Sequence, residues 1–180
     1  MSKVYSVKVN KYATLFGGAM NITDSPEYKD TVKIGALLAE RGYIVKNGGY
    51  GGMMEAVSKG ASEAGGKVIG YTCAAFGDHP GNEYLSAEIQ RKDIYDRLRS
   101  LITGTELFIV QRGGVGTLSE LFLVLDVIRK MDNKPKVILV GMFWLELMAV
   151  VEPMMRRKEA KSITVVADYE ALVPIIEALQ

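Results

Sequence analysis

The chain has 180 residues, of which 48% are hydrophobic and 24% are charged, a balance typical of globular proteins and unlike that of disordered or fibrous chains. Lys and Arg total 22 against 21 Asp and Glu, and the net charge of +1 provides no general attraction toward nucleic acid or an anionic membrane. The single cysteine, Cys73, and the single histidine, His79, exclude a disulfide framework and the usual Cys/His zinc site within one chain. We therefore expect no metal and no nucleic-acid partner.

The chain is long enough to form its own core, because about 70% of the unfolded surface is buried at this length. We expect a single domain over residues 1–180. The first residues, MSKVYSVKVNKY, contain no apolar signal core, and no run approaches the roughly 18 apolar residues of a membrane span. The sequence therefore predicts a cytoplasmic protein with no membrane partner.

Short apolar runs alternate with longer segments of helical periodicity, which is the pattern of a parallel sheet covered by helices. The runs lack polar alternation, as is typical of strands that are buried on both faces. The predicted strands are 13–16, 43–46, 67–71, 107–110, 136–140 and 163–166, and the predicted helices are 26–41, 53–64, 94–102, 118–130, 143–157 and 169–179. We expect an α/β fold, a doubly wound, mostly parallel Rossmann-like sheet with helices on both faces.

Several helix ends carry recognisable signals. Ser25 precedes Pro26 and offers a capping hydroxyl, Gly42 is a C-terminal stop signal, and Asp168 is a candidate cap for the last helix. The long stretch 72–92 carries no such pattern and has Gly77, Asp78, His79, Pro80 and Gly81 at its centre. Its length predicts a functional loop.

Three of the loops that follow strands are rich in glycine, at 17–18, 48–52 and 113–116. Glycine lets backbone N–H groups approach a phosphate, and the N-terminus of the following helix adds partial positive charge. One such loop would be equally consistent with a tight turn, whereas three at the same sheet edge favour a phosphate or nucleotide site. The predicted binding residues are Gly17, Gly18, Gly48, Gly49, Gly52, Met54, Gly113, Gly114, Val115, Gly116 and Thr117.

Two common nucleotide motifs are missing from these loops. The first loop, Gly17-Gly18-Ala19-Met20, does not read G-x-G-x-x-G, and G-x-x-x-x-G-K-[ST] does not occur in the sequence. The sequence therefore disfavours a classical NAD dehydrogenase and a Walker-type ATPase.

The segment RGGVGTLSE, residues 112–120, resembles the PGGxGTxxE signature of the Lonely Guy (LOG) family, whose members were once labelled possible lysine decarboxylases. The segment NGGYGGMMEA, residues 47–56, is similar to the second signature of that family, which reads GGGxxGxMG in some branches and GGGPGIMEA in others. Arg97 stands fifteen residues before Arg112, the spacing that the family keeps between an arginine and the proline of PGGxGTxxE. With the later NKPKVILVG segment, the resemblance covers nearly the whole chain.

The resemblance implies a Rossmann-like homodimer that binds AMP or cytokinin nucleotides. Active members hydrolyse the N-glycosidic bond and release the base and ribose 5-phosphate. In the family register Arg97 contacts the ligand, with Arg99 as the alternative, and we expect Arg97 and Glu120 to be the catalytic residues, with Glu120 as the carboxylate. We expect no cofactor, because pyridoxal phosphate would need a Schiff-base lysine that the glycine motifs do not supply.

Two departures from the family pattern keep other interpretations open. Leu98 stands where the family has lysine or asparagine, and Arg112 replaces the signature proline, with a side chain that either strengthens anion binding or points outward. The alternatives are a binding protein for a nucleotide or a phosphorylated cofactor, such as a molybdenum cofactor carrier, and an interaction module that senses a nucleotide. The two candidate catalytic residues also have explanations that involve no ligand. Under these, Glu120 is an acid in the first turn of a helix, where it stabilises the helix dipole, and Arg97 is a surface partner of Asp93.

The remaining expectations concern assembly and isolated residues. The helix at 118–130 is more apolar than one buried face requires, which predicts a homodimer, with a tetramer as the alternative, and places this helix and 94–102 near the interface. Cys73 is expected to pack as a small apolar side chain, and His79 to have no catalytic role. Glu55 matches either the GIMEA glutamate or an ordinary helix acid.

Overall fold

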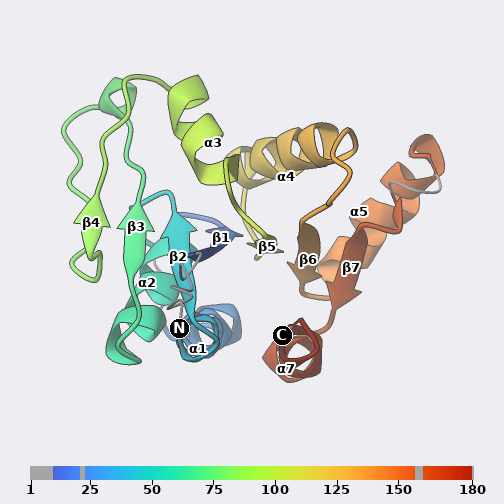
Figure 1. The fold of residues 1–180 in the computed structure, drawn as a ribbon, viewed down its shortest axis with the longest axis horizontal. Helices are drawn as coiled ribbons and strands as arrows, with labels where there is room; N and C mark the ends of the chain where they lie inside the picture. Colours follow the sequence, from blue (N-terminus) through green and yellow to red (C-terminus); the bar gives the residue numbers. More distant parts are fainter. Residues whose placement is uncertain (1–9, 21–22, 157–159, 180) are drawn as a thin grey trace, which may run out of the picture.

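A seven-stranded parallel sheet forms the centre of the protein in the computed structural model, which describes residues 10–20, 23–156 and 160–179 (Figure 1). The strands are β1 (Lys11–Phe16), β2 (Tyr43–Asn47), β3 (Val68–Gly70), β4 (Ala87–Glu88), β5 (Leu107–Val110), β6 (Lys136–Val140) and β7 (Ile163–Val166). They lie in the order β4-β3-β2-β1-β5-β6-β7, so the direction of winding reverses between β1 and β5. The predicted doubly wound α/β fold is confirmed.

Helices cover both faces of this sheet (Figure 1). On one face lie α1 (Pro26–Glu40), α2 (Met53–Glu63) and α7 (Tyr169–Glu177), and on the other α3 (Ile94–Ile102), α4 (Val115–Ile128) and α5 (Phe143–Val151). The sequence of β5 is apolar throughout because both of its faces are buried. Leu107 and Ile109 pack into one core cluster, and Phe108 and Val110 pack into the other. Burial on both faces favours an apolar side chain at each position of this strand.

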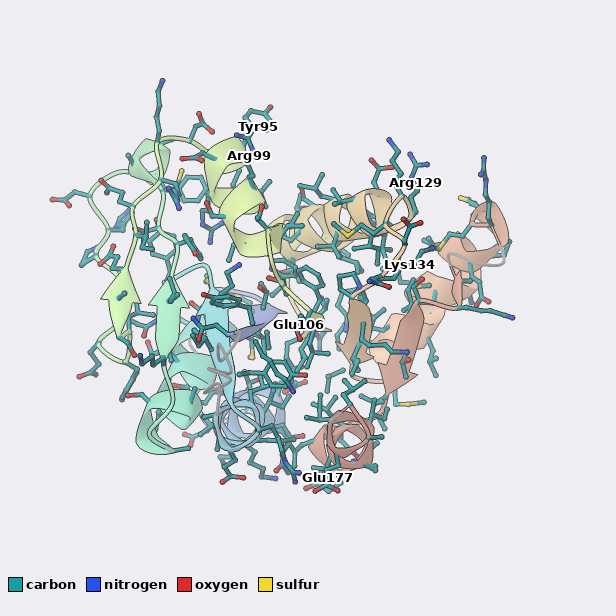
Figure 2. All side chains as sticks on the ribbon, viewed as in Figure 1. Tyr95, Arg99, Glu106, Arg129, Lys134 and Glu177 are labelled. Carbon is teal, nitrogen blue, oxygen red and sulfur yellow. The ribbon has the colours of Figure 1, made fainter. Side chains whose placement is uncertain are left out.

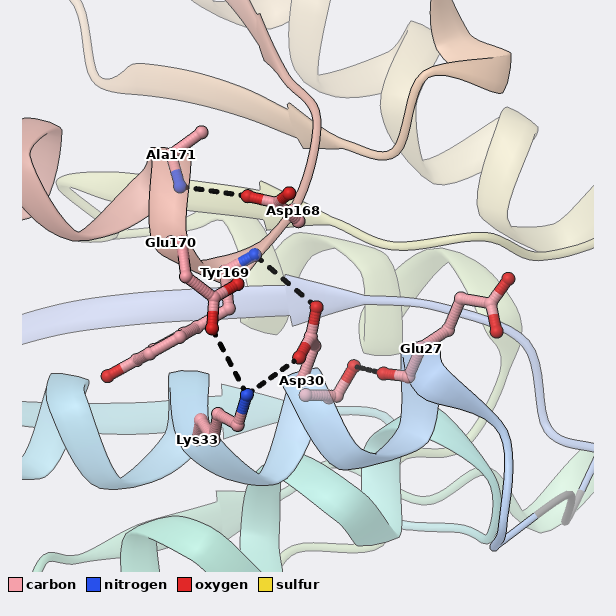
Figure 3. A network of polar contacts seen from close by, with 8 residues as sticks. Glu27, Asp30, Lys33, Asp168, Tyr169, Glu170 and Ala171 are labelled. Atoms are coloured by element: carbon pink, nitrogen blue, oxygen red, sulfur yellow. Dashed lines mark hydrogen bonds and ion pairs between the residues drawn. The ribbon is translucent and has the colours of Figure 1, made fainter.

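Polar contacts join α1 to the start of α7 (Figure 3). The ammonium of Lys33 lies 3.2 Å from Asp30 and 3.3 Å from Glu170, and the N–H of Tyr169 donates to Asp30 at 3.4 Å. Exposed ion pairs of this kind contribute roughly 0–1 kcal/mol each to the stability of the fold. The apolar residues that α7 buries in the core therefore contribute more to holding this helix against the sheet. The predicted cap of α7 is confirmed, because Asp168 accepts from the N–H of Ala171 at 2.9 Å.

The start of α1 also follows the prediction. The hydroxyl of Ser25 accepts from the N–H of Tyr28 at 3.1 Å, and Pro26 occupies the first turn. Gly42, just beyond the helix, has a φ of +78°, a conformation that favours glycine. Short-range capping signals therefore place both ends of this helix.

Helix α4 begins three residues earlier than predicted, at Val115 instead of residue 118. Its N-cap is Gly114, whose carbonyl accepts from the N–H of Leu118 at 3.1 Å, and no side chain caps this end. Gly116 and Thr117 therefore belong to the first turn of the helix, and Glu120 belongs to its second turn.

The predicted helix 143–157 is shorter in the structure. Helix α5 ends at Val151 and a 3-10 turn, η2 (Glu152–Met154), follows it, while residue 157 lies outside the described residues. Pro153, which has no backbone N–H, lies in that turn.

The stretch 72–92, predicted as a loop, contains a 3-10 turn, η1 (Ala74–Phe76), and the short edge strand β4. Both residues of β4 are exposed, so the strand carries none of the apolar pattern that marks the others. Among the described residues, no helix is long and apolar enough to cross a membrane.

Candidate functional site

The three glycine loops meet at the carboxyl edge of the sheet, where β1, β2 and β5 end side by side. The N–H of Gly18 donates to the carbonyl of Arg112 at 3.0 Å, and the N–H of Met53 donates to the carbonyl of Gly18 at 2.9 Å. A Cβ atom on Gly17 would lie 2.5 Å from the Cβ of Met53. The first loop is thus held between the other two, and Gly17 has no room for a side chain.

A cleft of about 600 Å³ opens between these loops, α3 and the start of α4. It lies at the point where the winding of the sheet reverses, the usual position for a ligand in an open α/β sheet. Ten of the residues predicted as site residues line it, namely Gly17, Gly18, Gly48, Met54, Arg97, Gly114, Val115, Gly116, Thr117 and Glu120.

Three predicted binding residues, Gly49, Gly52 and Gly113, do not line the cleft. They shape its loops instead. Gly49 and Gly52 have φ values of +83° and +65°, which favour glycine, and a Cβ on Gly113 would lie 2.0 Å from the hydroxyl of Thr117. Their lack of side chains is required by the fold of the loops.

Arg97 is a buried side chain with fixed contacts. Its Nε donates to the carbonyl of Tyr71 at 2.7 Å, and its Nη2 donates to the carbonyl of Gly48 at 3.2 Å. A Cβ on Gly48 would lie 1.8 Å from Nη2, so glycine at this position lets the guanidinium reach the loop. The alternative interpretation, in which Arg97 pairs with Asp93 at the surface, is wrong, since Asp93 caps α3 and accepts from the N–H of Asp96 at 2.9 Å.

Glu120 lies beside Arg97 in the lining of the cleft and forms an ion pair with it. Its Oε1 lies 3.5 Å from Nη1 of Arg97, and only 13% of its side chain is exposed. Burial raises the pKa of Glu120 to about 7, and the nearby guanidinium opposes this change only in part. Glu120 therefore holds a proton more readily near neutral pH than an exposed carboxylate does. The interpretation of Glu120 as a first-turn acid is wrong, because α4 begins five residues before it.

The N-terminus of α4 presents backbone donors at the cleft. The N–H groups of Val115, Gly116 and Thr117 occupy the first turn, where a helix supplies no acceptor of its own. A Cβ on Gly114 or Gly116 would meet no atom within 4 Å, and neither residue has a positive φ. The protein's own packing therefore does not require glycine at these two positions, while a bound anion approaching the backbone would.

Two aromatic residues that the sequence did not identify, Tyr50 and Phe76, line the cleft beside Arg97. Their ring centroids are 6.3 Å apart, and each ring lies 5.7 Å from the guanidinium carbon of Arg97. The N–H of Cys73 donates to the hydroxyl of Tyr50 at 2.9 Å, which joins the stretch 72–92 to the second glycine loop. The sequence signal that could have indicated this part of the cleft was the aromatic residue Phe76 within the long stretch 72–92.

The other candidate residues lie away from the cleft. Arg112 points outward, with 68% of its side chain exposed, 3.9 Å from Glu27 and over the ring of Phe143. The carboxylate of Glu55 accepts from the hydroxyl of Tyr28 at 3.0 Å. Arg99 does not line the cleft, and Cys73 is buried as predicted. In the described part of the chain, no group of three or more His, Cys, Asp or Glu residues is placed to hold a metal ion.

The parallel sheet, its winding and the cleft at its reversal point define a Rossmann-like α/β protein. The chain belongs to the SLOG cluster4 family, a LOG-like family whose model matches residues 10–173. The resemblance drawn from the two glycine signatures is confirmed.

Two relatives share sequence with this chain. An uncharacterised protein of Archaeoglobus fulgidus is 31% identical over 120 residues, which cover 66% of this chain and 78% of that protein. A cytokinin riboside 5′-monophosphate phosphoribohydrolase of Mycobacterium tuberculosis is 32% identical over 96 residues, which cover 50% of this chain and 49% of that enzyme. The match thus spans about half the length of the enzyme.

Solved structures show the same fold. The molybdenum cofactor binding protein of Rippkaea orientalis has a TM-score of 0.77 and 22% identity, covering 96% of this chain and 99% of that one. The molybdenum cofactor carrier protein of Chlamydomonas reinhardtii has a TM-score of 0.76 and 22% identity, covering 95% and 98%. At this identity the likeness concerns the fold alone.

Proposed function

We propose that the protein is a nucleoside 5′-monophosphate phosphoribohydrolase, which hydrolyses the N-glycosidic bond of AMP or of a cytokinin riboside 5′-monophosphate. The observation that carries this proposal is the pair of Arg97 and Glu120, 3.5 Å apart, in the same cleft as the N-terminus of α4. The match to the Mycobacterium tuberculosis phosphoribohydrolase supports it. The products are the free base and ribose 5-phosphate.

The cleft offers a different surface to each part of such a nucleotide. The 5′-phosphate binds the N–H groups of Gly114 and Gly116 and the hydroxyl of Thr117, where the partial positive charge of α4 favours an anion. The base lies against the rings of Tyr50 and Phe76, which provide apolar faces for stacking. The ribose then lies between them, within reach of Glu120.

The reaction needs help where charge develops. As the bond between C1′ and the base nitrogen breaks, its electron pair leaves with the base and the sugar acquires oxocarbenium character. Ionised Glu120 stabilises that positive charge and accepts a proton from the water whose oxygen bonds to C1′. This proton then passes to the base nitrogen that took the electron pair, which gives the free base and leaves Glu120 ionised again. A pKa of about 7 suits a group that takes up and releases a proton at neutral pH. Arg97 is a positioning residue, because its bonds to two carbonyl groups fix its guanidinium beside Glu120.

Product release is the direct test. Purified protein is incubated with AMP and, separately, with isopentenyladenosine monophosphate, and free base is quantified by chromatography. We expect base from at least one of them, and we expect Glu120→Gln, which keeps the shape of the side chain, to abolish most of the release. Absence of base from both nucleotides rejects the enzymatic proposal.

A second candidate, a binding protein without turnover, is favoured by Leu98. This buried side chain lines the cleft at the position after Arg97, where the LOG family that the chain resembles has lysine or asparagine. A carrier of a nucleotide or a phosphorylated cofactor such as molybdenum cofactor would bind its ligand tightly and release it unchanged. Calorimetry separates the two candidates, because Glu120→Ala would then leave the affinity for the ligand nearly unchanged and no base would form.

We also propose a homodimer that covers part of α4. Phe122 and Leu123 on this helix, and Tyr95 on α3, are large apolar side chains that stay exposed in the single chain. Burial of such side chains is favourable by about 25 cal/mol per Å². Light scattering at micromolar concentration is expected to give the mass of two chains, and a monomer would contradict the proposal.

A further inference from the structure

A second pocket lies on the far side of α3 from the cleft. It has a volume of about 430 Å³ and is lined by Tyr12, Lys46, Ile69, Tyr71, Arg91, Asp96, Arg99, Ser100 and Thr103. We call it the α3 pocket. It shares no lining residue with the cleft, because α3 turns Arg97 and Leu98 toward the cleft and Arg99 and Ser100 toward this pocket.

Lys46 is the most unusual residue of the α3 pocket, since it is a buried cation without a carboxylate. Only 3% of it is exposed. Its ammonium donates to the carbonyl of Thr103 at 2.8 Å and to the hydroxyl of Thr105 at 3.3 Å, and it lies 5.1 Å from the centre of the Tyr12 ring. These neutral partners use two of its three N–H donors and supply no negative charge. Burial lowers the pKa of Lys46 to about 8.

Arg91 adds a second cation with an unused donor. Its guanidinium carbon lies 5.4 Å from the centre of the Tyr71 ring, and its Nε is buried without a hydrogen-bond partner among the described residues. Within the described part of the chain, neither Arg91 nor Lys46 forms an ion pair. A buried donor that stays unpaired costs roughly 1–3 kcal/mol, so an acceptor that enters the pocket gains at this position.

The remaining charges of the α3 pocket leave an excess of positive charge. Arg99, on α3 beside Tyr95, is exposed (Figure 2), and Asp96 is the single carboxylate in the lining. Three cations therefore stand against one carboxylate. Two tyrosine rings and three cations in a pocket of this size match a small anion of high charge better than an apolar ligand.

We propose that the α3 pocket is a second anion-binding site, which takes a small phosphate-bearing molecule between Lys46, Arg91 and Arg99. The phosphate oxygens accept hydrogen bonds from the unused donors of Lys46, which is buried, and Arg91, which is half-buried, and they supply negative charge that these two cations lack. Arg99 reaches the same anion from the exposed end of α3. This site stands on its own residues and does not depend on the reaction proposed for the cleft.

Phosphate titration followed by nuclear magnetic resonance tests the site, because it reports on each pocket separately. Inorganic phosphate is added to the ¹⁵N-labelled protein at constant ionic strength. The amide signals of Ser100 and Thr103 report on the α3 pocket, and those of Gly114 and Gly116 report on the cleft. We expect saturable shifts of Ser100 and Thr103 that follow their own binding curve.

Matched variants assign the binding to the named side chains. Arg91→Met is expected to weaken phosphate binding at Ser100 and Thr103 about tenfold or more, the effect of removing one charge-assisted contact, while the signals of Gly114 and Gly116 titrate as before. Lys92→Met removes the same charge from the exposed neighbouring residue, and we expect it to leave both curves unchanged. Arg99→Met, a change at an exposed position, gives the same test if Arg91→Met does not fold.

Two results would overturn the proposal. In the first, Ser100 and Thr103 fail to shift, or shift linearly without saturation, while the cleft signals titrate. In the second, they saturate but neither Arg91→Met nor Arg99→Met changes the curve. Both results leave the proposal for the cleft untouched, and a cleft that fails to bind phosphate would equally leave this one standing.

Discussion

Two buried cations lie on opposite sides of α3, and their surroundings differ. In the cleft, Arg97 lies 3.5 Å from Glu120 and is fixed by two backbone carbonyls. In the α3 pocket, Lys46 contacts tyrosine rings and neutral oxygen atoms and has no carboxylate partner among the residues described. The cleft therefore contains a carboxylate that can bind a proton, which the proposed hydrolysis needs. The α3 pocket instead has three cations against one carboxylate, an excess of positive charge that suits the proposed binding of an anion.

Removing the carboxylate of the cleft should abolish this difference, and we expect the largest effect from it. Glu120→Gln keeps the shape of the side chain but removes its charge, so kcat for nucleotide hydrolysis should fall about a hundredfold or more while the affinity for the nucleotide is largely kept. Steady-state kinetics and calorimetry measure the two quantities. Glu146→Gln, at an exposed position of α5, is the matched control. Lower affinity with an unchanged kcat would make Glu120 a ribose anchor and remove its catalytic role.

The buried carboxylate should also make stability depend on pH. Folding raises the pKa of Glu120 from its ordinary 4.5 to about 7, so the folded protein binds a proton more tightly than the unfolded chain. Its contribution is therefore most favourable below pH 4.5, declines as the pH rises, and is fully lost above pH 7. Between pH 5 and pH 8, the free energy of unfolding of the wild type should fall relative to that of Glu120→Gln by up to about 3 kcal/mol.

Urea unfolding of both proteins at pH 5 and pH 8 measures this change. The comparison with Glu120→Gln removes the contributions of all other titrating groups, because both proteins share them. An equal stability difference at the two pH values would mean that Glu120 is ionised in the folded protein throughout this range.

A smaller effect is expected from the phosphate end of the cleft. Thr117 is buried in the first turn of α4, and Thr117→Ala removes one charge-assisted hydrogen bond to the phosphate, worth roughly 1.5–3 kcal/mol. Because the phosphate is charged before and after the reaction, KM should rise about tenfold or more while much of kcat is kept. Thr164→Ala, at an exposed position of β7, should change neither constant. A fall in kcat with an unchanged KM would place Thr117 at the reacting bond.

Much of the fold could be predicted from the sequence, because its signals are local. Strands buried on both faces are apolar runs, and capping residues such as Ser25 and Asp168 lie next to the helices they begin. The elements that the sequence predicted wrongly or not at all also have physical explanations. Strand β4 is exposed and therefore lacks the apolar pattern that predicts a buried strand. Helix α4 begins at Val115 after the N-cap Gly114, which has no side chain that could serve as a capping signal in the sequence.

The site was predictable only as far as its motifs reach. The glycine loops and the motif positions of Arg97 and Glu120 predicted ten of the residues that line the cleft. The carbonyls of Tyr71 and Gly48 that hold Arg97 are 26 and 49 residues away from it along the chain, and they meet it only in the folded sheet. The aromatic wall at Tyr50 and Phe76 and the whole α3 pocket depend on the same kind of long-range packing.

The smallest effect is expected from replacing Gly116, and it distinguishes a glycine that a ligand requires from a glycine that the fold requires. Gly116 lies in the first turn of α4, has open space around its Cβ position and has no positive φ. Alanine is the better helix former by roughly 0.5–1 kcal/mol, so Gly116→Ala should leave the melting temperature unchanged or slightly higher. Its methyl group would stand where the phosphate approaches the backbone, and the affinity for AMP should fall roughly threefold or more.

Gly113→Ala is the contrasting variant, since its Cβ would lie 2.0 Å from the hydroxyl of Thr117 and 2.8 Å from the backbone nitrogen of Gly18, and it should lower the melting temperature. Thermal unfolding and calorimetry measure both variants, and an unchanged affinity for AMP in Gly116→Ala would mean that the phosphate does not bind at the N-terminus of α4.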